Sequence, residues 1–116
     1  MALSRSFRET VADRARRDPA FAAALVEEAL QTMIEGDFET ARAMLRDCIN
    51  ATVGFDAISR ETHIATKSLM RMVGPKGNPT ATHLFAMVGA LQKRAGVVAH
   101  VQVEAASQRE LELEPA

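Results

Sequence analysis

Apolar residues recur at helical spacing through the first half of the chain, and capping signals divide them into segments. Asp18 followed by Pro19 is typical of a helix start, and it separates a short first helix from a second one that ends at Gly36. Asp37 is predicted to cap a third helix, whose apolar stripe stops at residues 52–54. The pattern therefore predicts a series of amphipathic helices before residue 55.

The segment FDAISRETHIATKSLMRMV, residues 55–73, follows a different pattern. Its apolar residues stand at positions 58, 64, 69 and 72, with a small residue at 59 and a three-residue turn at 63–65. This spacing is typical of two short helices, the first capped by Asp56, that cross steeply and pack through the turn. The sequence therefore predicts a helix-turn-helix, whose second helix directs four polar side chains outward: Thr66, Lys67, Ser68 and Arg71.

Turn-forming residues follow in VGPKGNPT, residues 73–80. Thr80 is predicted to cap a further helix that runs through Arg94, with core positions at Leu84, Phe85, Val88 and Leu91. Backbone N–H groups at the start of this helix, with Lys76 nearby, are a natural seat for a phosphate, and Asn78 and Thr80 can add hydrogen bonds to a DNA backbone. The alternative is a plain connecting loop.

Alternating residues over 97–103 predict a short strand, with Val97, Ala99, Val101 and Val103 on one face. Because no second strand pattern is evident, the simplest pairing partner is the same strand of a second copy, which predicts a homodimer. In the alternative, the segment packs against its own helices. The small, acidic tail over 105–116 is predicted to be disordered.

Charge is segregated along the 116 residues although the net charge is only -1. Residues 1–59 carry a net charge of -3, residues 60–94 carry +5, and residues 95–116 carry -3. A basic window between acidic ones indicates a local surface that attracts anions, with a merely solvated face as the alternative. The content of 47% hydrophobic and 25% charged residues is that of an ordinary globular domain.

Catalytic and metal-binding patterns are weak. The histidines at 63, 83 and 100 share no metal-binding spacing, and GPKGNPT lacks the spacing of a phosphate-binding loop. The single cysteine, Cys48, excludes an internal disulfide and fits a reducing cytoplasm, and no apolar run reaches the length of a membrane span. The sequence therefore predicts a cytoplasmic binding protein with no enzymatic activity, no metal, no cofactor and no membrane partner.

From about residue 7 to residue 103 the chain resembles small phage-repressor-type helix-turn-helix proteins, which are addiction-module antidotes (HigA-like antitoxins) or prophage DNA-binding regulators. The resemblance rests on RDPAFAAALVEEAL, on GDFETARAMLRDCINATVG, on the segment 55–73, on GNP after it, and on a helix that ends in a valine-rich stretch. The family usually has glycine at the start of the turn, where His63 stands here.

The resemblance implies an all-α, phage-repressor-like domain over residues 1–104. It comprises an N-terminal helical extension (1–36), a helix-turn-helix core (37–94) and the strand (97–103).

The resemblance also implies double-stranded DNA as the ligand, bound at a palindromic operator. We expect Lys67 or Arg71 to reach base edges and Thr66 and Ser68 to contact bases or phosphates, while Arg60 and Lys76 hold phosphates on either side. The resulting hypothesis is a transcriptional repressor, which as an antidote represses its own operon and also binds a toxin. The alternatives are a stand-alone prophage-type repressor and an interaction module that does not bind DNA.

Overall fold

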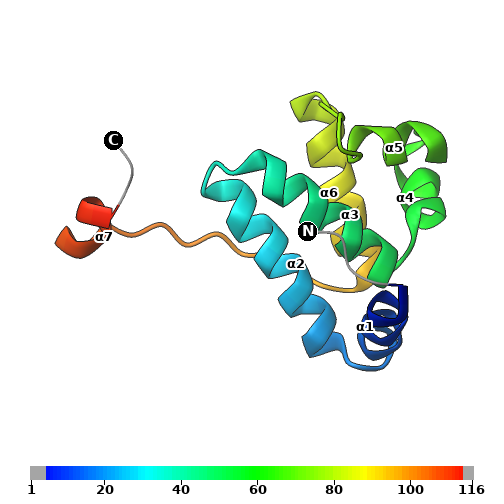
Figure 1. The fold of residues 1–116 in the computed structure, drawn as a ribbon, viewed down its shortest axis with the longest axis horizontal. Coiled ribbons are helices and arrows are strands. Elements are labelled where there is room, and N and C mark those ends of the chain that lie inside the picture. The colour runs from blue at the N-terminus through cyan, green and yellow to red at the C-terminus, as the bar shows by residue number, and fades with distance from the viewer. Residues whose placement is uncertain (1–4, 114–116) are drawn as a thin grey trace.

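The computed structural model describes residues 5–113, and this part of the chain is helical and contains no strand. The predicted all-α class is therefore confirmed, although the predicted strand is wrong. The helices are α1 (Arg5–Arg17), α2 (Pro19–Ile34), α3 (Phe38–Ala51), α4 (Phe55–Thr62), α5 (Thr66–Met72), α6 (Ala81–Ala95) and α7 (Gln108–Leu113). Helices α1 to α6 form one body, and an extended segment carries α7 away from it (Figure 1).

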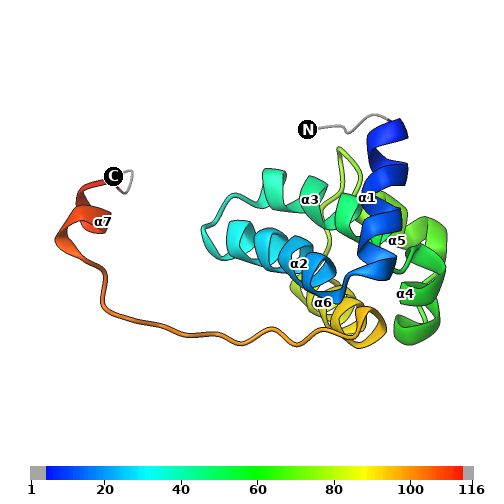
Figure 2. The same cartoon turned by 90° about the horizontal axis from the view of Figure 1, so that it is seen from below.

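Helix α3 lies at the centre of this body (Figures 1 and 2). It packs against α1 and α2 on the N-terminal side, while α4 packs against both α5 and α6. The largest fully buried side chains come from α3 to α6 and from the residue after α5: Leu45, Ile49, Ile58, Leu69, Val73, Met87 and Leu91. One hydrophobic core therefore joins the N-terminal extension to the rest of the body.

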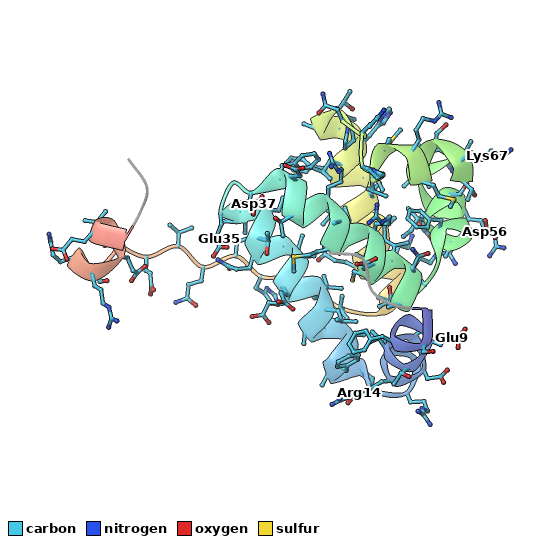
Figure 3. All side chains as sticks on the ribbon, viewed as in Figure 1. Glu9, Arg14, Glu35, Asp37, Asp56 and Lys67 are labelled. Atoms are coloured by element: carbon cyan, nitrogen blue, oxygen red, sulfur yellow. The ribbon has the colours of Figure 1, made fainter. Side chains whose placement is uncertain are left out.

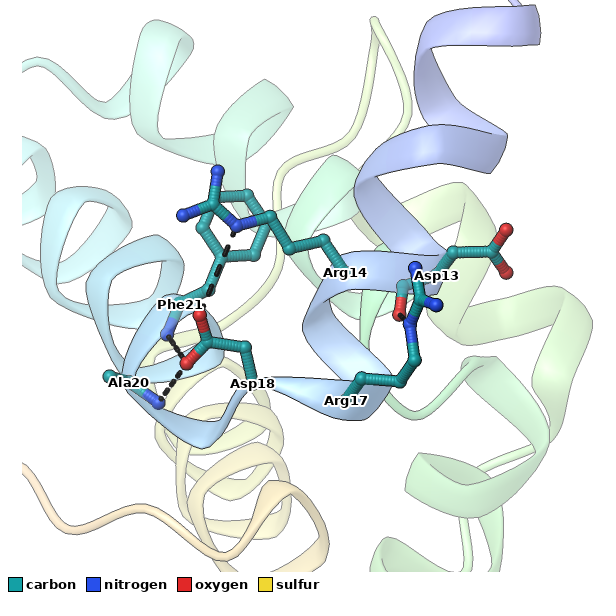
Figure 4. A network of polar contacts seen from close by, with 6 residues as sticks. All are labelled: Asp13, Arg14, Arg17, Asp18, Ala20 and Phe21. Atoms are coloured by element: carbon teal, nitrogen blue, oxygen red, sulfur yellow. Dashed lines mark hydrogen bonds and ion pairs between the residues drawn. The ribbon is translucent and has the colours of Figure 1, made fainter.

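The predicted caps of α2 and α3 are confirmed. The Asp18 carboxylate accepts hydrogen bonds from the N–H groups of Ala20 and Phe21, at 3.1 and 3.2 Å, so it satisfies two N–H groups that have no partner within the helix (Figure 4). The guanidinium of Arg14 lies 4.5 Å from the centre of the Phe21 ring and closes the corner between α1 and α2. Asp37 caps α3 in the same way, through the N–H of Thr40.

Two local predictions are wrong. Asp56 does not cap α4, because Gly54 occupies the cap position and Asp56 lies in the first turn of the helix. Phe85 is not a core residue: its side chain is 71% exposed, and Met87, Ala90 and Leu91 form the buried face of α6 instead. Helical spacing alone cannot choose between these positions, because both 85 and 87 lie within one turn of residues that are buried.

Residues 97–103 form no strand. Val97 packs against the core and the Ala99 N–H donates to the Gln92 side chain at 2.9 Å, whereas Val101 and Val103 are 77% and 88% exposed. The physical reason is that no strand within residues 5–113 offers a ladder to pair with. We call residues 97–107 the C-terminal arm. It leads to α7, which occupies part of the tail that the sequence predicts to be disordered.

None of the helices within residues 5–113 combines the length and the apolar character needed to cross a lipid bilayer.

Arg42 of α3 holds the loop after α5. The Arg42 guanidinium donates to the backbone oxygens of Pro75 and Gly77, at 2.8 and 2.9 Å. At Gly77 the chain passes so close to the backbone oxygen of Met72 that a Cβ atom at position 77 would overlap it. Only glycine fits there without a backbone shift.

We predict that Gly77→Ala lowers the free energy of unfolding by about 2 to 3 kcal/mol, because the backbone of α5 or of the loop must move. The matched control is Gly89→Ala, at an exposed position of α6 with open space around it. This change should raise stability by about 0.5 to 1 kcal/mol, because alanine favours the helix. Urea unfolding of the two variants measures both effects, and equal behaviour of the two would contradict the prediction.

Candidate nucleic-acid interface

The corner between α4 and α5 is built from two buried side chains and a short turn. Ile58 of α4 and Leu69 of α5 are both fully buried. His63 ends α4 in the left-handed conformation, with φ of 59°, which few residues other than glycine adopt. The Ser59 hydroxyl donates to the backbone oxygen of Ile64 at 2.6 Å, so the small residue also ties the turn to the helix before it. The predicted pair of short helices and the three-residue turn between them are confirmed.

Of the four side chains that the sequence directs outward on α5, two are exposed and two, Thr66 and Ser68, are half-buried. Lys67 and Arg71 are exposed, and Lys67 points away from the body (Figure 3). Thr66 is half-buried, and its hydroxyl donates to the Asp56 carboxylate at 3.1 Å. Met70 is 51% exposed and adds an apolar contact surface beside the cations.

A shallow groove brings several of the predicted residues together. It has a volume of about 290 Å³ and lies between α5 and the following loop. Four predicted DNA-binding residues line it: Ser68, Arg71, Lys76 and Asn78. The groove therefore joins the end of α5 to residues from a separate segment of the chain, with two cationic side chains among its walls.

The remaining predicted residues lie outside the groove. Arg60 is exposed in the last turn of α4. Thr80 is exposed and caps α6, because its hydroxyl oxygen accepts from the His83 N–H at 3.2 Å. A capping hydroxyl can still donate its own proton, so Thr80 keeps one hydrogen bond for a ligand.

Two cations of the basic window are engaged elsewhere. Lys93 and Arg94 of α6 pair with Glu61 of α4, at 3.1 and 2.9 Å. The hydrogen bond from Lys93 is the main cause that holds the pKa of Glu61 below its ordinary value of 4.5, and the charges of both cations act in the same direction. The exposed cations left in the basic window are Arg60, Lys67, Arg71 and Lys76.

Sequence reasoning missed the arginines of α3 that hold this surface in place. Arg42 binds the loop as described, and the Arg46 guanidinium lies 3.5 Å from the backbone oxygen of Val73, directly after α5. These contacts span 27 to 35 residues along the chain. No local spacing could reveal them, because both arginines stand within an ordinary amphipathic pattern.

Other chemistry finds little support in the described part of the chain. No group of three or more histidine, cysteine, aspartate or glutamate side chains within it could hold a metal ion. Burial raises the pKa of the Cys48 thiol to about 12, so this thiol stays protonated and unreactive at neutral pH.

Comparison of the chain with models of protein families, with curated proteins and with solved structures finds no match.

We predict that Glu61→Gln lowers the melting temperature at neutral pH, because it removes the charge that Lys93 and Arg94 bind. A carboxylate whose pKa is lowered by folding stabilises the protein above its unfolded-state pKa, and this stabilisation is lost as the pH falls through the folded-state pKa. The difference from the wild type should therefore shrink as the pH falls below 4.5 and disappear below the lowered pKa of Glu61 in the folded protein. Thermal unfolding at neutral and acidic pH measures it.

The control for this prediction is Glu104→Gln in the exposed C-terminal arm, which should change neither melting temperature. If Glu61→Gln lowered the melting temperature equally at both pH values, the packing of residue 61, and not its charge, would be the cause.

Proposed function

We propose that the protein is a sequence-specific DNA-binding regulator in the cytoplasm, with α4 and α5 as a phage-repressor-like helix-turn-helix and α5 as its recognition helix. The observation that carries the proposal is the exposed polar side of α5, with Lys67 and Arg71 directed away from a buried corner. An α-helix with such a side has the width to enter the major groove of DNA. No catalytic role is part of the proposal.

The groove beside α5 supports a division of roles among the cations. Arg71 can reach guanine O6 and N7, since a long cation makes a bidentate contact there, and Lys67 offers a second base contact one turn before it. Lys76, Asn78 and Ser68 lie where a phosphate backbone would pass along the edge of α5. Arg60 and the start of α6 at Thr80 supply further phosphate contacts.

We include a homodimer in the proposal. Two copies related by a twofold axis would present two recognition helices to half-sites about 34 Å apart, and the operator would be an imperfect palindrome. The exposed valines of the C-terminal arm support an association of the two arms, because a second copy could bury them.

The antitoxin role is a further part of the proposal. Residues 18–41 contain no basic residue and include Asp18, Glu27, Glu28, Glu35, Asp37 and Glu39. All but Asp18 are exposed on α2 and at the start of α3. A small basic toxin would be attracted to this surface. Co-expression with the product of an adjacent gene tests the role, and a neighbour that forms no complex would leave the regulator function alone.

We expect Lys67→Ala and Arg71→Ala each to weaken operator binding by about 1 to 3 kcal/mol, because each removes a contact to a base edge. The operator is first selected by the wild-type protein from a pool of random duplexes, and affinities are then measured at one fixed low salt concentration.

Lys93→Ala is the matched control for these variants, because it removes a cation of the same basic window that is bound to Glu61. It should leave operator affinity within about 0.5 kcal/mol of the wild type. Unchanged affinity in both α5 variants would contradict the recognition-helix assignment and favour an interaction module that does not bind DNA.

We further expect Val101→Asp to shift the protein toward the monomer, because the change places a charge on the face of the arm that carries Val103. Gln102→Asp adds the same charge at the neighbouring position, which an extended chain directs to the opposite side, and should leave the dimer intact. Analytical ultracentrifugation over a concentration series measures both. A wild type that is monomeric at all concentrations would refute the arm-mediated dimer.

A further inference from the structure

The N-terminal part of the body contains a hollow that the proposed DNA contacts do not use. It has a volume of about 350 Å³ and lies between α1, α2 and α3. Small-molecule sites in proteins have volumes of roughly 300 to 1,000 Å³ and mostly apolar walls, so this hollow reaches the lower end of that range. Its apolar walls come from all three helices: Val11, Leu25, Met44, Cys48 and Ala51.

Two carboxylates stand among these apolar walls. Glu28 of α2 is exposed and Asp47 of α3 is half-buried, and both line the hollow. Neither carboxylate pairs with a cationic side chain in the described part of the chain. Both carboxylates are therefore available to a ligand.

We propose that this hollow, which we call the α1–α3 pocket, binds a small amphipathic ligand with an apolar body and an ammonium group. The apolar body would displace water from the walls around Met44 and Cys48, which gives most of the affinity. The ammonium group would lie at Glu28 and Asp47, which favours a cation over an anion of the same shape. Cys48 takes no chemical part, since its thiol is protonated at neutral pH.

Helix α3 connects the pocket to the surface formed by α5 and the loop after it. Met44, Asp47 and Cys48 face the pocket, whereas Arg42 and Arg46 of the same helix hold the backbone oxygens after α5. A ligand that moves α3 would therefore move the loop as well, because these hydrogen bonds connect the two. This coupling rests on the proposed DNA-binding function, whereas the ligand site itself does not.

The test uses octylammonium and octanoate as probes, because they have chains of the same length and opposite charges. Each is titrated into the full-length protein and followed by NMR of isotope-labelled methyl groups, without DNA. We expect saturable shifts at Val11, Leu25 and Met44 with octylammonium, and an affinity for octanoate at least about fivefold lower. Equal binding of the two probes would overturn the assignment of an ammonium ligand.

Variants separate the pocket from general attraction to an acidic protein. Glu28→Gln should weaken octylammonium binding by about two- to fivefold, because one of the two carboxylates loses its charge. The matched control, Glu27→Gln, removes the same charge from the preceding residue of α2, which does not line the pocket. Equal weakening by both variants would indicate attraction to the acidic face of α2, as expected for a docked basic protein, and would overturn the proposal.

A third variant fills the pocket. Val11→Phe adds an aromatic ring to its α1 wall and should abolish the saturable shifts while the melting temperature shows that the protein remains folded. Absence of any shift in the wild type would mean that residues of the chain itself close the pocket in solution, and would also overturn the proposal.

Operator binding in the presence and absence of octylammonium tests the coupling separately. If the ligand binds without changing operator affinity, the proposed coupling is refuted and the proposed ligand site stands. Failure of all operator binding would refute the proposed function without affecting the NMR result, so the two failures can be distinguished.

Discussion

The geometry of the candidate interface depends on the angle between α4 and α5, because that angle decides which side of α5 faces solvent. Burial of Ile58 and Leu69 pulls the two helices together, and the left-handed backbone at His63 lets the chain turn sharply between them. A non-glycine residue in this conformation costs of order 1 kcal/mol, which the two buried side chains outweigh at roughly 1.5 to 3 kcal/mol each. The outward position of Lys67 and Arg71 follows from this balance.

Charged side chains stabilise this geometry in two ways: through ion pairs between helices and through hydrogen bonds to the loop backbone. Pairing with Glu61 takes Lys93 and Arg94 out of the basic window and uses them to join α4 to α6. Arg42 and Arg46, which lie in the acidic N-terminal half of the sequence, stabilise the loop after α5. A count of charges along the chain therefore overstates how many cations of the window remain for a polyanion.

Local signals in the sequence were enough to predict most helices. Caps such as Asp18 and Asp37 act within three residues, so their chemistry can be recognised from neighbouring letters. The failures concern choices that only tertiary contacts decide. Met87, and not Phe85, is buried on α6, and Arg42 reaches backbone oxygens 33 and 35 residues away. For the candidate site, spacing identified the outward residues of α5, whereas the arginines behind the groove left no local signal.

The failed strand at 97–103 shows the limit of a periodic pattern without a partner. Alternation states which side chains share a face, but a ladder needs a second backbone. Full burial of Val101 and Val103 in two copies would contribute roughly 6 to 12 kcal/mol, and association costs roughly 4 to 15 kcal/mol. The free energy gained by burying these valines is thus about equal to the cost of association. A stable dimer would need more apolar surface than these valines, and Ile34 of α2, which is exposed and lines the same hollow as Val101 and Val103, would add to it.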